Sequence, residues 1–252
     1  MPIKKKIVCL LLIAGAILIN YCGHAQSAKP VFVIVHGAWG GSWAFKKTDS
    51  LLTEKGCIVY RPSLTGQGER VHLASTAIRL QTHINDVVNM ILYEDLHNVV
   101  LVGHSYGGMV ITGVADSVAD HIKKIIYLDA FVPNSGESAM TINGGRSDGL
   151  MRMAKDGFLV PSWVKAGTPP PHDVPHPVKT LTDTLILKNR AQNIPVTYIL
   201  TVDPGKEARS DNFYIHAERA RSRGWKMIEM SADHNPQWSK VDELVKLLYD
   251  NR

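Results

Sequence analysis

The strongest constraint on the fold is a short serine turn near the middle of the chain. Four apolar residues, Val99 to Val102, run directly into Gly-His-Ser-Tyr-Gly-Gly at 103–108, and a helical pattern follows. A G-x-S-x-G pattern between a strand and a helix forms a sharp turn, because the two backbones approach each other closely beside the serine. Small residues are needed two positions before and after it, and Gly103 and Gly107 meet this need. The pattern predicts that Ser105 stands above the edge of a sheet.

The rest of the sequence alternates short buried strands with longer amphipathic segments. This alternation is typical of an α/β fold with a mostly parallel sheet and helices on both faces. The expected strands cover residues 31–35, 58–60, 98–102, 124–128, 196–202 and 226–230. The expected helices cover about residues 42–55, 80–96, 106–118, 212–223 and 236–248.

Residues 131–190 break the alternation. Six prolines between 161 and 177 forbid a long uninterrupted helix there. A connection of this length commonly forms a lid over a site, and a disordered linker is the alternative. We therefore expect residues 26–252 to form a single domain with a cap insertion at about 131–190.

Residues 1–25 have the composition of a secretory signal peptide. Three lysines at 4–6 precede an apolar run of thirteen residues, Ile7 to Ile19. This run is shorter than the roughly 20 residues of a membrane-spanning helix. We expect cleavage near Ala25, export to the periplasm or out of the cell, and no stable membrane association afterwards. An uncleaved N-terminal anchor is the alternative.

Charge and cysteine content narrow the function classes further. The 28 Lys and Arg residues include the three leader lysines, which leaves 25 basic residues against 23 acidic ones. A nucleic-acid-binding domain would need a clustered basic face, so no nucleic-acid partner is expected. Cys9 and Cys22 lie in or beside the leader, so Cys57 has no partner for an internal disulfide. Lipid attachment at Cys22 is disfavoured by Tyr21 before it.

A serine hydroxyl becomes a good nucleophile only beside a general base, usually a histidine oriented by a carboxylate. On this type of fold the acid and the histidine follow the serine along the chain. Asp203 and His234 each follow one of the last two expected strands. The carboxyl ends of parallel strands share one edge, so Ser105, Asp203 and His234 can converge there. Asp129 and Asp211 are alternative carboxylates.

An oxyanion hole would complete such a site. This type of fold uses the backbone N–H after the serine and a second N–H from the loop after the first core strand. Those groups belong to Tyr106 and Ala38. The glycine-rich loop at 36–41 can turn its amides toward the site, although a plain tight turn would have the same composition.

Several stretches closely resemble one branch of the α/β-hydrolase superfamily, the plant methylesterases and hydroxynitrile lyases with their bacterial esterase relatives. The similar stretches are the loop at 36–43, residues 62–70, the serine turn and residues 127–133. The similarity runs from about Val31 to the C-terminus and is weakest at 144–179. It implies a hydrolase for small esters, without metal or cofactor, that carries Ser105, Asp203 and His234 at its triad positions.

The lyases of this branch differ from the chain at two informative positions. The lyases have threonine directly after the loop histidine and lysine directly after the catalytic histidine. This sequence has Gly37 and Asn235 at those positions. Without that lysine there is no obvious cation for a departing cyanide. The expected function is therefore a serine carboxylesterase that hydrolyses small hydrophobic or aromatic esters through an acyl-enzyme, with the ester as its small-molecule partner.

Three other function classes fit parts of the sequence less well. A dinucleotide-binding fingerprint would need a third glycine after Gly66 and Gly68. His172, Asp173 and His176 could be metal ligands, but the neighbouring prolines disrupt the helix that would align them. A noncatalytic ligand-binding protein on the same fold stays open, and it would bind a hydrophobic ligand without turnover.

Overall fold

The computed structural model describes residues 28–142 and 147–252. The expected leader at 1–25 therefore lies outside the described residues. Within those two ranges, no helix is both long enough and apolar enough to cross a membrane.

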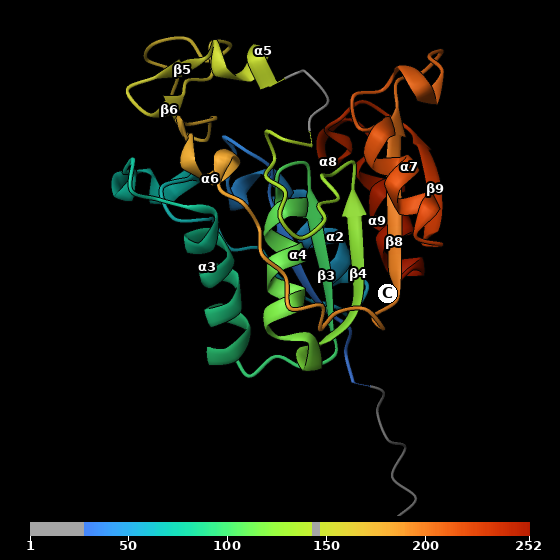
Figure 1. Ribbon diagram of the computed structural model, residues 1–252. Helices are drawn as coiled ribbons and strands as arrows, with labels where there is room; N and C mark the ends of the chain where they lie inside the picture. The colour runs from blue at the N-terminus through green and yellow to red at the C-terminus, as the bar shows by residue number, and fades with distance from the viewer. Residues whose placement is uncertain (1–27, 143–146) are drawn as a thin grey trace, which may run out of the picture.

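A six-stranded sheet forms the centre of the molecule (Figure 1). Its strands run in the order β2-β1-β3-β4-β8-β9, and every pairing in it is parallel. This arrangement confirms the fold class predicted from the sequence. The strands are β1 (Val31–Val35), β2 (Ile58–Tyr60), β3 (Val99–His104), β4 (Ile122–Leu128), β8 (Val196–Val202) and β9 (Lys226–Ser231).

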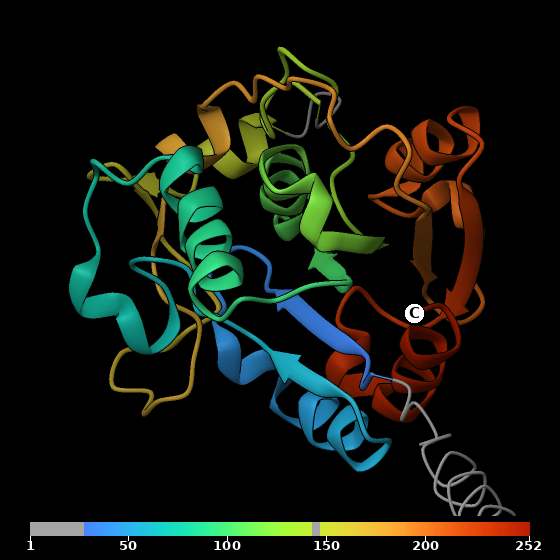
Figure 2. The same cartoon turned by 90° about the horizontal axis from the view of Figure 1, so that it is seen from below.

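Helices cover both faces of the sheet, as Figure 2 shows along the strands. The helices α3 (Leu80–Tyr93), α4 (Gly107–Ser117) and α7 (Tyr214–Ser222) pack on one face. The helices α2 (Lys46–Glu54) and α9 (Val241–Asp250) pack on the other. Shorter turns of helix are η1 (Ser42–Phe45), η2 (Gly68–Leu73), η3 (Ala119–His121), η4 (Ala208–Ser210) and α8 (Pro236–Ser239).

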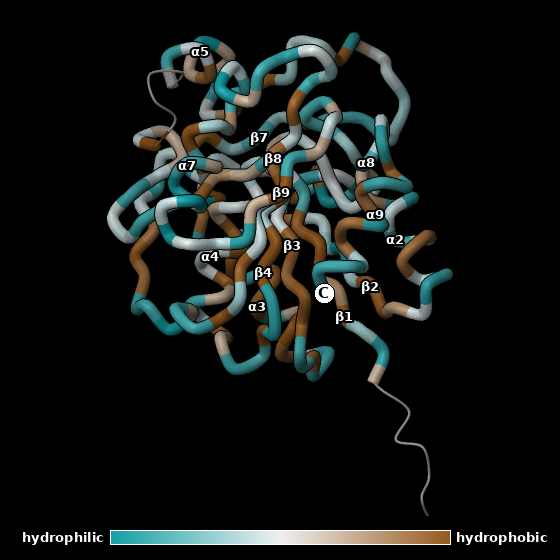
Figure 3. Tube along the Cα trace, turned by 90° about the vertical axis from the view of Figure 1, so that its right-hand side faces the viewer, coloured by the Kyte–Doolittle hydropathy of each residue, from teal (hydrophilic) through white to brown (hydrophobic). Residues whose placement is uncertain are grey.

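The alternation of side chains along each strand divides the core into two layers. Val33 and Val35 of β1 pack with α3 and α4, whereas Phe32 and Ile34 pack with α2 and α9. Both faces are covered, so β3 is buried along its whole length and its sequence is a continuous apolar run. Figure 3 shows the same pattern as hydrophobic strands inside a hydrophilic outer layer.

The residues between β4 and β8 include a small layer above the carboxyl edge of the sheet (Figure 1). We call residues 147–182 the cap segment. Its short strands pair antiparallel in the order β5-β6-β7. The cap segment contains α5 (Ser147–Met151), β5 (Ala154–Lys155), β6 (Phe158–Leu159), β7 (His176–Pro177) and α6 (Lys179–Thr182).

Hydrogen bonds join the cap segment to the loop that follows β1. Trp39 donates its indole N–H to the Leu159 carbonyl at 2.9 Å, and its own carbonyl accepts the Val174 N–H at 2.9 Å. The Gln67 amide donates to the Pro175 carbonyl at 3.1 Å. The cap segment is thus attached to the core beside Ser105, since Trp39 and Ser105 line the same pockets.

Candidate active site

The turn between β3 and α4 holds Ser105 in the left-handed backbone region, with φ of 54°. Such a conformation is uncommon for a residue other than glycine and is kept only where the surroundings enforce it. The Ser105 N–H donates to the Leu128 carbonyl at 3.2 Å, and the Ser105 carbonyl accepts the N–H groups of Gly108 and Phe131 at 3.0 and 3.1 Å. These bonds fix the serine above the sheet, as its sequence context predicts.

The glycines around the serine are required by close backbone approaches. A Cβ at Gly107 would lie 2.6 Å from the Val35 carbonyl oxygen, and one at Gly103 would lie 2.8 Å from the Gly107 carbonyl oxygen. A Cβ at Gly108 would lie 2.2 Å from the carbonyl oxygen of Phe131. None of these backbone atoms can move without displacing a strand or the helix.

His234 follows β9 and is held by a buried carboxylate. Its Nδ1 donates to Oδ2 of Asp129 at 2.6 Å. Asp129 lies just after β4, is completely buried, and accepts the Thr201 N–H on its other oxygen at 3.2 Å. The bond to Asp129 puts the imidazole proton on Nδ1, so Nε2 of neutral His234 is available as a proton acceptor.

The structure corrects the carboxylate assigned from the sequence. Asp203 does not reach His234: it pairs with Lys206 at 2.6 Å, and its side chain is 41% exposed. Asp211, the other alternative, caps the following turn by accepting the Phe213 N–H at 2.7 Å. Asp129 and Asp203 both follow strands at the same sheet edge, and Asp129 has the buried position against the imidazole because β4 is adjacent to β3 in the sheet.

Two aromatic rings fix the position of His234. The Phe213 ring stacks on its imidazole, with centroids 4.8 Å apart and planes 9° from parallel. The His104 Nε2–H donates to the His234 carbonyl at 2.8 Å. Burial, together with the nearby His234, lowers the pKa of His104 to about 3. His104 therefore acts as a neutral hydrogen-bond donor next to Ser105, a role that its sequence position alone did not indicate.

The loop after β1 brings its backbone against the serine. A Cβ at Gly37 would lie 3.0 Å from the Cβ of Ser105. His36 fixes this loop, because its Nδ1–H donates to the Gly37 carbonyl at 2.7 Å and its Nε2 accepts the Leu64 N–H at 3.1 Å. Burial lowers the pKa of His36 to about 4, so the ring stays neutral. Among the described residues, the N–H groups of Ala38 and Tyr106 donate to no other part of the protein.

Two pockets meet at Ser105 and share Ala38, Trp39 and His234. The more polar of the two, called the polar pocket below, has a volume of about 430 Å³, and the other, called the apolar pocket, has a volume of about 400 Å³. Asp211 lies in the wall of the apolar pocket, where burial and the charge of Asp129 raise its pKa. The polar pocket is lined by Trp163, Asp173, Gln237 and Trp238, and the apolar pocket by Phe131, Leu150, Leu181 and Phe213.

A buried polar network lies behind the serine turn. His83 donates from Nε2 to the Thr65 carbonyl at 3.0 Å and accepts the Tyr106 hydroxyl on Nδ1 at 2.9 Å. His176 of β7 lies 4.8 Å from the Tyr106 ring and bonds Thr180 at 2.7 Å through Nε2. Burial lowers the pKa of both histidines, to about 4 for His83. This network joins the cap segment to the residue that follows Ser105.

The residues considered as metal ligands do not come together. His176 belongs to the buried network, whereas Asp173 accepts the Trp163 indole N–H at 2.7 Å. His172 bonds the Asp173 backbone carbonyl at 2.7 Å. In residues 28–142 and 147–252, no three side chains of the metal-binding types form a cluster that could hold an ion.

Comparison with known families gives a match over most of the chain. Residues 32–247 match the sequence model of the alpha/beta hydrolase family. The chain belongs to this family. The match agrees with the strand–turn–helix placement of Ser105 and with the parallel sheet, and it confirms the family resemblance seen in the sequence.

Curated relatives of the chain include bacterial and plant esterases. A carbendazim hydrolyzing esterase from a Nocardioides species is 52% identical over 111 residues, covering 44% of this chain and 46% of the relative. A pheophorbidase from Raphanus sativus is 30% identical over 155 residues, covering 60% and 56%. Methylesterase 2 from Arabidopsis thaliana is 33% identical over 116 residues, covering 45% and 44%. The chain thus spans about half the length of the curated relatives it matches.

Solved structures support the fold over a longer range. An extracellular alpha/beta-hydrolase from a Paenibacillus species superimposes with a TM-score of 0.74 at 24% identity, covering 88% of this chain and 98% of that one. The methylesterase MES16 from Arabidopsis superimposes with a TM-score of 0.67 at 23% identity, covering 88% and 98%. At these identities the likeness concerns the fold.

Proposed function

We propose that the protein is a serine carboxylesterase with Ser105, His234 and Asp129 as its catalytic triad. The observation that carries the proposal is the 2.6 Å bond from His234 Nδ1 to the buried Asp129, with Ser105 and His234 lining the same two pockets. The left-handed conformation of Ser105 and its glycine neighbours support the same assignment.

In this proposal the reaction is acyl transfer to water. Nε2 of His234 takes the hydroxyl proton as Ser105 Oγ attacks the ester carbonyl, and the N–H groups of Ala38 and Tyr106 bind the oxyanion. His234 then gives the proton to the alcohol oxygen as the alcohol departs. The acyl group stays bonded to Ser105 as an ester. A water molecule gives a proton to His234 and attacks the acyl carbon; His234 then returns this proton to Ser105 Oγ, and the acid leaves. Asp129 stabilises the imidazolium in each step.

The two pockets suggest which esters fit. In the tetrahedral intermediate, the carbon bonded to Ser105 Oγ and to the oxyanion also carries the acyl side and the alcohol side of the ester. The apolar pocket suits a hydrophobic or aromatic acyl group of ring size. Asp211 also lines this pocket and adds a carboxyl group to its mostly apolar wall. We infer that Asp211 favours acyl groups with an N–H donor, because a hydrogen bond to a partly buried carboxylate stabilises the complex more than a neutral pair does. The relationship to a carbendazim hydrolyzing esterase supports testing heteroaromatic substrates.

The proposal is tested by hydrolysis of p-nitrophenyl acetate, butyrate and octanoate, and of carbendazim. The purified protein is compared with a Ser105→Ala variant, in which turnover is expected to fall on the order of a million-fold. Full activity in that variant would overturn the assignment of Ser105. Saturable binding of the esters without turnover in the unmodified protein would instead favour the noncatalytic ligand-binding alternative.

We further propose that the protein is exported after removal of residues 1–25, whose composition supports a signal peptide. N-terminal sequencing of the protein from the cell exterior or periplasm tests this. A mature chain that begins near Ala25 or Gln26 is the expected result. A chain that keeps Met1 and stays with the membrane fraction would favour the uncleaved anchor.

A further inference from the structure

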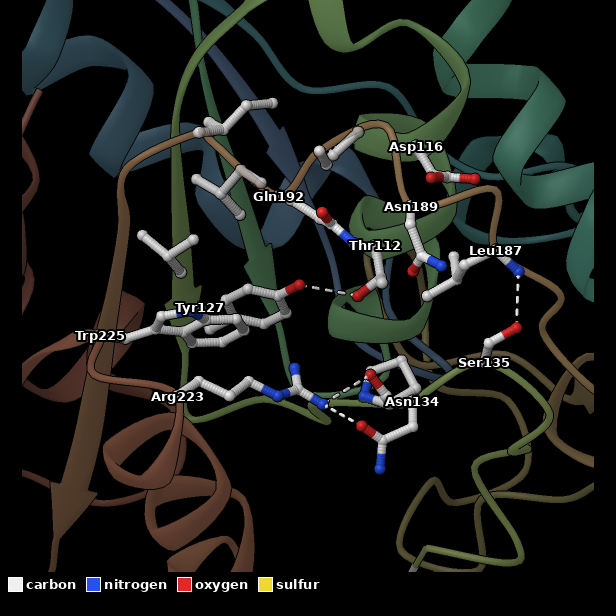
Figure 4. Close-up of a pocket in the computed structure, with 16 residues that line it drawn as sticks. Thr112, Asp116, Tyr127, Asn134, Ser135, Leu187, Asn189, Gln192, Arg223 and Trp225 are labelled. Atoms are coloured by element: carbon white, nitrogen blue, oxygen red, sulfur yellow. Dashed lines mark hydrogen bonds between the residues drawn. The ribbon is translucent and has the colours of Figure 1, made fainter.

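A third pocket lies away from Ser105, beside Thr112 and Asp116 in the C-terminal half of α4 (Figure 4). Its volume is about 340 Å³, and none of its lining residues lines the pockets at Ser105. Figure 4 shows Arg223 reaching from the end of α7 toward Asn134, with Trp225 and Tyr127 beside it. Neither the family match nor the triad gives this pocket a role.

Arg223 carries a positive charge with no paired carboxylate among the described residues. Its Nη2 donates to the Pro133 carbonyl at 3.0 Å and to the Asn134 side-chain oxygen at 2.7 Å, and these acceptors are neutral. Its guanidinium lies 5.0 Å from the Trp225 ring centroid. Burial lowers the pKa of Arg223, because the charged guanidinium loses part of its contact with water. A half-buried cation in this state favours an anionic ligand.

The nearby carboxylates are already occupied. Both oxygens of Glu137 bind Arg219, at 2.5 and 3.0 Å. Asp116 lines the pocket, but its two oxygens accept the backbone N–H groups of Lys188 and Arg190 at 2.6 and 2.8 Å. Neither acid forms an ion pair with Arg223 among the described residues, and the charge of Asp116 is directed to two backbone N–H groups instead.

The remaining walls restrict the shape of an anion that could bind. One side is apolar and includes Trp225, whose ring stacks on Tyr127 with centroids 5.2 Å apart. Facing them, Asn189 and Gln192 present side-chain amides that can donate hydrogen bonds. A ligand with one anionic end and one apolar end satisfies both sides. Inorganic phosphate would leave the apolar wall without a partner. Further apolar lining residues are Ile125, Leu187, Ile194 and Val196.

We propose that this pocket binds a small monocarboxylate with an aromatic or branched apolar body, with the carboxylate on Arg223 and the body against Trp225. The guanidinium suits a carboxylate because it offers charged N–H donors on Nη1 and Nε as well. The site is independent of ester hydrolysis at Ser105.

Tryptophan placement provides a test that separates this pocket from the site at Ser105. Of the five tryptophans, Trp39, Trp163 and Trp238 line the polar pocket, and Trp43 stacks on Trp238. Trp225 lies in the third pocket, beside Arg223. In protein labelled with 5-fluorotryptophan, ¹⁹F NMR therefore reports both sites in one titration, and a Trp225→Phe variant assigns the Trp225 resonance. Benzoate, acetate and inorganic phosphate are the probes.

Benzoate is expected to shift the Trp225 resonance saturably, at lower concentration than acetate or phosphate. Arg223→Gln should weaken this binding at least tenfold, because it removes the charged partner. Arg221→Gln is the matched control, since Arg221 is on the same helix but pairs with Glu218 at the surface. Ala191→Leu, which adds volume to the half-buried pocket wall, should also weaken binding while Arg223 is intact.

A Trp225 resonance that does not move with benzoate would overturn the proposal, as would equal shifts in the Arg223→Gln and Arg221→Gln proteins. Shifts confined to the other four tryptophans would place benzoate at the Ser105 pockets alone, which also contradicts it. The melting temperature of Arg223→Gln shows whether this variant folds. If it does not fold, Ala191→Leu is the variant that tests the proposal. Unchanged benzoate affinity in Ala191→Leu would then overturn the proposal.

Discussion

Asp129 holds the imidazole of His234 from inside the protein, where water does not compete for its carboxylate. Both of its oxygens are satisfied, one by His234 Nδ1 and the other by the Thr201 N–H. Asp203, in contrast, makes an exposed pair with Lys206. Exposed pairs of this kind contribute little to stability and have no access to the imidazole.

Replacing these aspartates one at a time separates their roles. Asp129→Asn should lower kcat by roughly 10³ to 10⁴-fold, because the amide no longer stabilises the imidazolium or its required tautomer. Asp203→Asn should change kcat by less than about threefold, since an exposed pair is worth under about 1 kcal/mol. Steady-state kinetics with p-nitrophenyl butyrate measure both. A large loss in Asp203→Asn with a small loss in Asp129→Asn would reverse the assignment.

Asp211 is a third single residue to test, and it is expected to affect the choice of ester substrate. Methyl indole-2-carboxylate and methyl benzofuran-2-carboxylate differ mainly in an N–H that the second ester lacks. Asp211→Ala should reduce the preference for the indole ester about tenfold in kcat/KM, as expected for one hydrogen bond to a charged group. The raised pKa of Asp211 means that this preference in the unmodified protein grows as pH rises and the carboxyl group ionises. Asp203→Ala is the control, and an unchanged preference in Asp211→Ala would remove Asp211 from substrate selection.

At the scale of elements, the sequence predicted the core well and the cap segment poorly. The strands β1, β2 and β8 begin and end at the predicted residues. The helices agree within a few residues, apart from the two expected segments that divide into η1 with α2 and into α8 with α9. Continuous apolar runs and 3.6-residue periodicity are strong signals because both sheet faces are covered.

The cap segment and the carboxylate have no comparably local signal. The strands β5, β6 and β7 have two residues each, too short for an alternating pattern to develop. Asp129 and Asp203 both follow predicted strands, and their burial depends on loop paths that are set by tertiary packing. The sequence could therefore place Ser105 and His234 at one edge without deciding which aspartate reaches the imidazole.

The serine turn is an element in which one added methyl group should be costly. Gly108→Ala would bring a Cβ to 2.2 Å from the Phe131 carbonyl oxygen, so it should lower the free energy of unfolding by about 3 kcal/mol or more. Gly149→Ala in α5 is the matched control, because its Cβ would find no atom nearer than 3.7 Å. Urea unfolding curves compare the two. Equal stability of the variants would mean that the turn relaxes without strain.

At the scale of the whole molecule, buried neutral histidines should make the fold sensitive to acid. From an ordinary value of 6.5, burial lowers the pKa of His36 and His83 to about 4 and that of His104 to about 3, and it lowers the pKa of His176 as well. Between these values the unfolded chain binds protons that the folded chain does not. The stabilising contribution is therefore complete well above pH 6.5 and is lost as pH falls toward 4, by up to about 5 kcal/mol per pH unit near pH 5 for the four histidines together.

Urea unfolding at pH 7, 6 and 5 measures this slope. His83→Gln should reduce the slope by about one quarter, even though it destabilises the protein at pH 7. His97→Gln is the control, because the His97 side chain is 58% exposed and should leave the slope unchanged. A slope that is the same in all three proteins would contradict protonation of His83 as a cause of acid unfolding.

The attachment of the cap segment through Trp39 has a consequence for how such proteins can diversify. Trp39 directly follows Ala38, whose N–H binds the oxyanion in the proposed mechanism. The indole N–H and the carbonyl of Trp39 are both hydrogen-bonded to cap residues. A chimera that receives a foreign cap but keeps its own loop at 36–41 would thus lose catalytic geometry along with its old selectivity. The two segments form one transplantable unit, and successful exchanges between relatives should carry both.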